Sequence, residues 1–142
     1  MEIQYFLPGE IEKRSFEIIG EELSVRKIVL PERERPVTMR VIHTSADFDY
    51  ARTLKFSEKA VETAENLILS GADIVTDTNM AKAGISRKTL SKFGGEVHCF
   101  MADDDVAAES KKRGATRAAV SMEKAARLAA EKGKKLIFAV GN

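Results

Sequence analysis

Residues 67–77 read LILSGADIVTD. The apolar residues before Ser70 close an amphipathic helix that begins at Ser57, and the pair Ser70-Gly71 is a typical helix-ending signal. Residues 72–75 are short and apolar, so they predict a buried strand that follows the helix at once. This junction indicates a fold in which helices and strands alternate along the chain.

The same alternation continues towards the carboxyl end. The expected elements are a short helix over 86–92, a strand over 96–101, a helix over 106–113, a long helix over 117–132 and a strand over 135–140. Strands separated by helices pair in parallel, because each helix carries the chain back to the end of the sheet at which the previous strand began. We therefore predict an α/β, Rossmann-like fold with a mostly parallel sheet and helices on both faces.

Towards the amino end, residues 8–23 have apolar side chains at helical spacing and predict the first helix. Residues 30–36 lie between two prolines and alternate in charge, which is typical of a connector. The β-branched run 37–42 then predicts a strand, and His43 follows at its end.

Length and charge narrow the function classes. The 142 residues suffice for one domain with a core, which we expect over residues 1–142. A formal charge of +1 gives no overall field that would attract nucleic acid or a membrane surface. We find no signal peptide and no apolar run of roughly 18 residues that would span a bilayer, so the expected location is cytoplasmic.

Ligands of such sheets bind beyond the carboxyl ends of the strands, which directs attention to the loops there. His43 lies in the first of these loops and is suited to exchange a proton near neutral pH, although a structural role fits equally well. His98 lies in the middle of a predicted strand, which favours a structural role.

Other candidates stand at helix starts and strand ends. Asp77 follows a strand and suits orienting a histidine, binding Mg²⁺ or capping a turn. Thr116 and Arg117 open the longest helix, where backbone amides and a guanidinium hold anions, or where a threonine simply caps the helix. The acidic run 103–105 lacks calcium-loop spacing and reads as the start of a helix.

Several enzyme classes lack their motifs. No G-x-G-x-x-G, G-x-x-x-x-G-K-[ST] or G-x-S-x-G sequence occurs after a predicted strand, which argues against dinucleotide sites, P-loops and hydrolase elbows. The chain has one cysteine and two histidines, and no metal site is predicted. A proton-handling site with arginines for an anionic substrate remains.

Five sequence segments in register resemble one family, the precorrin-8X methylmutases or precorrin isomerases. They are RSFEII at 14–19, RVIHTSADF at 40–48, TDTNMAKAGI at 76–85, TR at 116–117 and VGN at 140–142. The resemblance spans residues 11–142. The resemblance implies that family members continue past the Gly-Asn with a further carboxy-terminal region, and this sequence ends at Asn142.

The resemblance implies an isomerase of cobalamin biosynthesis that moves the ring C methyl group of precorrin-8X, or of cobalt-precorrin-8, to the adjacent carbon. It implies no cofactor, and it implies a homodimer with the active site near the subunit interface. It makes His43 the proton donor and acceptor. The substrate contacts that it implies are Ser15, Arg40, Thr44, Asp77, Met80, Thr116 and Arg117.

Two rival hypotheses stay open at this point. One is a tetrapyrrole-binding or carrier protein without catalysis, and the other is an unrelated Rossmann-like module, because fold alone does not fix function. Arg40 and His43, three residues apart on a predicted strand, project to different faces. We therefore expect a bend, or a second subunit, to bring them onto one ligand.

Overall fold

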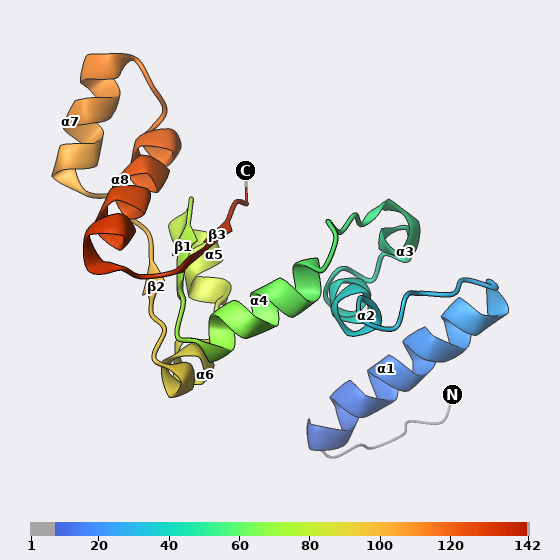
Figure 1. Cartoon of the computed structure of the whole chain (residues 1–142). Helices are drawn as coiled ribbons and strands as arrows, with labels where there is room; N and C mark the ends of the chain where they lie inside the picture. The colour runs from blue at the N-terminus through green and yellow to red at the C-terminus, as the bar shows by residue number, and fades with distance from the viewer. Residues whose placement is uncertain (1–7, 142) are drawn as a thin grey trace. The chain divides into compact units, whose positions relative to one another are not determined.

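The computed structural model describes residues 8–141, which divide into two compact units on either side of residues 61 and 62. The first unit is helical, and the second contains the sheet (Figure 1). The expectation of one domain over residues 1–142 stays a prediction. Within the described range, no helix is both long and apolar enough to cross a membrane.

The first unit consists of α1 (Pro8–Val25), α2 (Arg35–Ser45) and α3 (Tyr50–Thr53). Its core joins α1 to α2 through the buried side chains Ile19, Leu23, Met39 and Ile42. Leu23 follows Ile19 by four residues, and Ile42 follows Met39 by three, so each pair shares one face of its helix. The predicted first helix over 8–23 is confirmed and extends to Val25.

The strand predicted over residues 37–42 is wrong, because this stretch forms most of α2. Pro36 stands in the first turn of the helix, where a missing N–H removes no intrahelical hydrogen bond. Met39 and Ile42 are buried at a spacing that belongs to a helix face. Their burial against α1 outweighs the strand preference of the β-branched residues. His43 therefore lies in the last turn of a helix and not at a strand end.

The second unit contains a three-stranded parallel sheet in the order β2-β1-β3. The elements from α4 onward are α4 (Ala60–Leu69), β1 (Asp73–Thr76), α5 (Asn79–Gly84), α6 (Arg87–Leu90), the 3-10 helix η1 (Ser91–Phe93), β2 (Val97–His98), α7 (Asp104–Arg113), α8 (Arg117–Lys132) and β3 (Leu136–Ala139). Ile74 of β1 lies opposite Val97 of β2 and Ile137 of β3. Helices fill both crossovers, α8 packs against β1 and β3, and the predicted α/β fold is confirmed.

Helix α4 starts later than the sequence predicts. The helix expected from Ser57 begins at Ala60, because Lys59 has a φ of 56°, which is outside the right-handed helical region. The carbonyl of Ser57 accepts a turn hydrogen bond from the amide of Ala60 instead. The predicted end is confirmed, since α4 ends at Leu69 and is followed by Ser70 and by Gly71, which has a φ of 79°.

The segment between β1 and β2 is more helical than predicted. The residues between the predicted strand over 72–75 and the predicted helix over 86–92 contain α5, which Thr78 caps by accepting a hydrogen bond from the amide of Ala81 at 3.1 Å. The strand predicted over 96–101 is wrong in length, because β2 comprises only two residues. His98 therefore ends a strand and does not lie in the middle of one.

Gly95 precedes β2 at a point where neighbouring backbone leaves no room for a side chain. A Cβ there would lie 2.3 Å from the carbonyl oxygen of Ala72, which is backbone and cannot rotate away. We expect Gly95→Ala to lower the free energy of unfolding by about 1–3 kcal/mol, measured by urea unfolding.

The matched control is Gly84→Ala, because a Cβ at Gly84 meets nothing within 4 Å. Gly84 ends α5, so alanine should leave stability unchanged or raise it by up to about 1 kcal/mol. Equal stability of the two variants would contradict the proposed steric origin.

Candidate functional site

A pocket of about 230 Å³ in the first unit brings two predicted site residues together. Ser15 of α1 and His43 of α2 both line it, although 28 positions separate them in the sequence. The rest of the wall is mainly apolar and comes from Ile18, Ile19, Ile42, Ala46 and Phe48. The pocket therefore places an imidazole and a hydroxyl on an apolar surface.

The His43 ring stacks on the ring of Phe16, with 5.2 Å between the centroids and 25° between the planes. His43 is half-buried in the last turn of α2. The imidazole is thus both held by a neighbour and open to the pocket.

Arg40 extends over the same aromatic ring. Its guanidinium carbon lies 4.7 Å from the Phe16 centroid, and its Nη1 forms an ion pair with Glu12. Because α2 is a helix, residues three apart share a face, and Arg40 and His43 reach one ring without a bend. The strand from which the expectation of a bend followed is wrong, and whether a second subunit contributes to one ligand stays a prediction.

The two predicted hydroxyl residues of this unit bond to their own helices. Ser15 Oγ donates to the carbonyl of Ile11 at 3.0 Å, and Thr44 Oγ1 donates to the carbonyl of Arg40 at 2.9 Å. Such hydroxyls retain lone pairs that can accept from a ligand. Thr44 is exposed, whereas Ser15 lines the pocket.

Asp77 is buried at the carboxyl end of β1. Its two carboxylate oxygens accept from the amide of Gly141 at 2.9 and 3.0 Å, which joins the end of β1 to the residues that follow β3. Met80 in α5 is 86% exposed and presents an open apolar side chain. The substrate-binding roles of both residues stay predictions.

Thr116 caps α8, which was one of its two open interpretations. Its Oγ1 accepts from the amide of Ala119 at 3.2 Å. Arg117 is the first residue of α8 and is exposed. The four predicted residues of the second unit are thus Asp77 and Met80 near the sheet and Thr116 and Arg117 at the start of α8.

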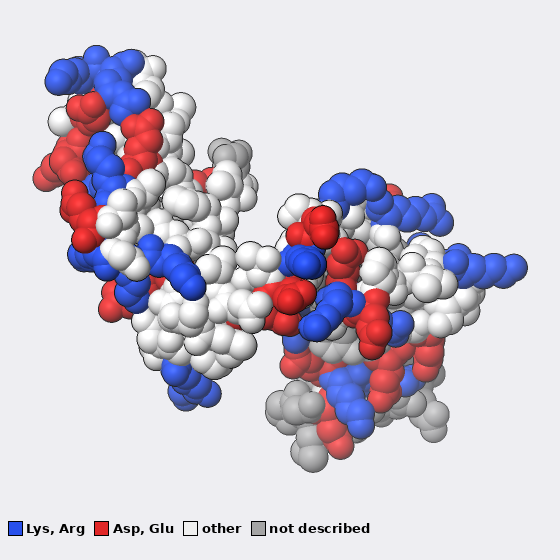
Figure 2. Space-filling view, viewed as in Figure 1, with Lys and Arg blue, Asp and Glu red and all other residues white. Residues whose placement is uncertain are grey.

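The charged runs of α7 and α8 pair with each other. Lys124 Nζ lies 2.7 Å from Asp103 Oδ2 and 2.7 Å from Asp105 Oδ1, and Arg113 bonds to Glu123. Figure 2 shows the two signs of charge interspersed in this region rather than gathered into a patch. Among the described residues, no cluster of three or more histidine, cysteine, aspartate or glutamate side chains could hold a metal ion.

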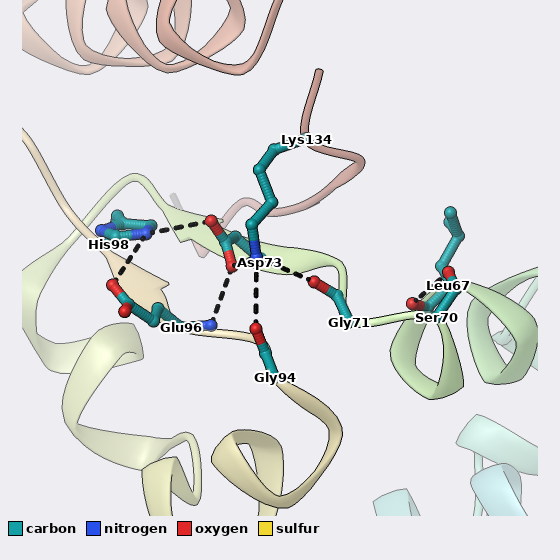
Figure 3. A network of polar contacts seen from close by, with 8 residues as sticks. All are labelled: Leu67, Ser70, Gly71, Asp73, Gly94, Glu96, His98 and Lys134. Atoms are coloured by element: carbon teal, nitrogen blue, oxygen red, sulfur yellow. Dashed lines mark hydrogen bonds and ion pairs between the residues drawn. The ribbon is translucent and has the colours of Figure 1, made fainter. Parts of the chain in front are cut away.

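One polar cluster was not predicted from the sequence. The buried carboxylate of Asp73 accepts from the amide of Glu96 at 2.9 Å and from Lys134 Nζ at 3.2 Å, and pairs with His98 Nε2 at 3.3 Å (Figure 3). We call Asp73, His98 and Lys134 the Asp73 cluster. Burial acts to raise the pKa of Asp73, but the hydrogen bonds from Glu96, Lys134 and His98 and the charge of Lys134 outweigh it, and the pKa falls below its usual value.

A pocket of about 280 Å³ lies beside this cluster, with apolar walls that include Phe100, Leu128 and Leu136. Lys134 Nζ has three protons and three acceptors at 3.2 Å, namely the Asp73 carboxylate and two backbone carbonyls. The ammonium is therefore satisfied internally. This agrees with a structural role for the cluster, which links the starts of the strands.

Comparison with known proteins identifies the family. The family model described as precorrin-8X methylmutase matches residues 10–142. The cobalt-precorrin-8 methylmutase of Priestia megaterium is 38% identical over 135 residues, which cover 95% of this chain and 57% of that protein. The enzyme of the same name from Salmonella typhimurium is 35% identical over 139 residues, or 95% of this chain and 64% of that protein.

A crystal structure of a precorrin-8X methylmutase from Thermus thermophilus superposes with a TM-score of 0.77 at 36% identity, covering 94% of this chain and 62% of that one. The chain thus spans about three fifths of the length of these relatives. The match over residues 10–142 includes both units and all eight predicted site residues. The chain belongs to the precorrin-8X methylmutase family.

Proposed function

We propose that this chain acts as an isomerase on precorrin-8X or its cobalt-containing counterpart, with His43 as the proton donor and acceptor. Membership in the family over residues 10–142 supports the reaction class. The observation that carries the residue assignment is the pocket where Ser15 and His43 meet, with Arg40 on the ring that His43 stacks on.

The reaction is a rearrangement within one molecule. The bond between the methyl group and one ring C carbon breaks, and a bond from the same methyl group to the adjacent carbon forms. A proton from His43 placed on the macrocycle would ease the migration, and its return to His43 afterwards leaves the composition unchanged. The balance requires no oxidant, reductant or cofactor.

The side chains suit an anionic, flat and largely apolar ligand. The substrate carries acetate and propionate arms, and an arginine binds carboxylates through several N–H donors. Arg40 is about half exposed, and its Nη1 pairs with Glu12. The other N–H donors of its guanidinium can bind a carboxylate of the ligand. We propose Ser15, Thr44, Asp77, Met80, Thr116 and Arg117 as the further substrate contacts.

We also propose that the chain works in the cytoplasm as a homodimer, as the family resemblance implies. Light scattering coupled to gel filtration measures the mass directly. A mass twice the 15.7 kDa of the chain is expected, and a monomer at working concentration would overturn this part of the proposal.

The test is incubation of the purified chain with precorrin-8X and, separately, with cobalt-precorrin-8. Conversion to the corrin product changes the absorption spectrum, and we expect that change with at least one of the two. Saturable binding without conversion would support the tetrapyrrole-binding alternative. A folded sample that neither binds nor converts either compound would overturn both.

A further inference from the structure

Among residues 8–141, the Phe16 ring contacts both His43 and Arg40. It stacks on the His43 imidazole and lies under the Arg40 guanidinium. Phe16 contacts His43 but does not line the pocket, whereas the preceding residue, Ser15, does. Sequence reasoning placed Phe16 in a family segment but gave it no role.

The position of Phe16 is set by the core. It lies three residues before Ile19 on α1 and packs against the buried cluster that joins α1 to α2. Arg40 and His43 project from α2 one helical turn apart, which is the spacing that lets two side chains reach one partner. The core thus holds the Phe16 ring in place, and the guanidinium of Arg40 and the imidazole of His43 pack against it.

Both polar groups have freedom that an aromatic neighbour removes. The second side-chain torsion of histidine is broad, so a buried Cβ alone does not fix the plane of the ring. Arginine loses rotamer entropy when it is held in one position, and a stacked guanidinium has already lost part of it. A leucine at position 16 would fill the core but would offer neither group a ring face.

We propose that Phe16 is a positioning residue that orients His43 and Arg40 together for one ligand. The expected effect on kcat rests on the proposed function. The expected effect on the NMR signals of His43 rests on the geometry alone. Glu12 completes the arrangement by pairing with the guanidinium. Because that ion pair is exposed, it contributes little energy and can yield Arg40 to a carboxylate of the ligand.

The spectroscopic test uses the two histidines of the chain. His43 stacks on Phe16, and His98 stacks on Phe100 with 5.7 Å between the centroids, so each phenylalanine is the matched control for the other. In proton NMR, Phe16→Leu should move the His43 ring signals towards those of an unstacked imidazole and leave those of His98 in place. Phe100→Leu should do the reverse, and Phe16→Tyr should preserve both.

The kinetic test compares the same variants, each shown to be folded by circular dichroism. Misplacement of a reacting group by about 1 Å can cost roughly 100-fold in rate, so Phe16→Leu should lower kcat by about 10- to 100-fold, with a smaller rise in KM. Phe16→Tyr keeps a ring face and should restore most of the rate. If Phe16 had a merely structural role, Phe16→Tyr would restore kcat only as far as it restores thermal stability.

The outcomes separate the two proposals. Unchanged His43 signals in Phe16→Leu, or shifted signals with an unchanged kcat, would overturn the positioning role. If the wild-type chain converts neither substrate, the proposed function fails, and the His43 signals still decide whether the Phe16 ring stacks on the imidazole.

Discussion

Replacement of His43 by glutamine is expected to reduce methyl migration by about 100- to 10,000-fold, which is the usual contribution of a positioned acid or base. Glutamine keeps a similar length and a hydrogen-bonding end, but it cannot exchange a proton near neutral pH. His43 is only half-buried at the end of α2, so the fold should survive the change. Initial rates at saturating substrate, with circular dichroism on the same samples, measure the effect.

The control is His98→Gln. His98 belongs to the Asp73 cluster of the second unit, and we give it no part in the reaction. This variant should retain the rate within a few fold while losing some stability. A His43→Gln enzyme with the full rate would show that another group handles the proton.

The second large effect is expected at Asp73. Asp73→Ala removes the acceptor of the Glu96 amide and the partner of both Lys134 and His98. An unsatisfied buried donor costs about 1–3 kcal/mol, and the lost bonds to charged groups add to it. Since Lys134 can turn towards water, we expect a total loss of about 2–4 kcal/mol in the free energy of unfolding. Urea unfolding at pH 7 measures this loss.

The charge of Asp73 adds a pH dependence of known direction. Its pKa is lower in the folded state than the ordinary value of 3.8, so the unfolded chain holds the proton more tightly. The resulting stability is complete above the unfolded pKa and is lost as the pH falls through the folded pKa.

Asp73→Asn isolates this contribution, because the amide oxygen can still accept from Glu96 but carries no charge. The stability gap between wild type and this variant should narrow as the pH falls from 7 to about 2. A gap that stays constant over that range would mean that the charge of Asp73 does not stabilise the fold.

Local sequence signals predicted most of the second unit. The long helix over 117–132 was found residue for residue, because a threonine cap precedes it and Gly133 with positive φ follows it. The strands around Ile74 and Ile137 were found to within a residue at their starts, since short apolar runs follow helix ends. Each of these signals depends only on a few residues that are neighbours in the sequence.

The error at α2 has a physical cause. Val37, Val41 and Ile42 favour a strand by propensity, whereas the decisive quantity is burial of Met39 and Ile42 against α1. That burial depends on a helix more than ten residues earlier in the chain, which a local pattern does not include.

The sequence predicted which residues belong to the site, but it did not predict how they contact one another. Family segments pointed to Ser15, Arg40 and His43, whereas the shared contact with Phe16 depends on how two helices pack. The Asp73 cluster was not foreseeable at all, because Lys134 lies 61 positions from Asp73 and each residue alone resembles an ordinary surface charge.

The helical form of α2 makes chain length a stricter requirement there than residue type. Each residue of a helix advances by about 100°, so Arg40 and His43 now project within about 60° of one another. Deletion of Val41 would leave them two positions apart, about 160° from each other, with every side chain unchanged. Evolution can exchange Val41 for another residue, but it cannot remove one without turning His43 away from Arg40.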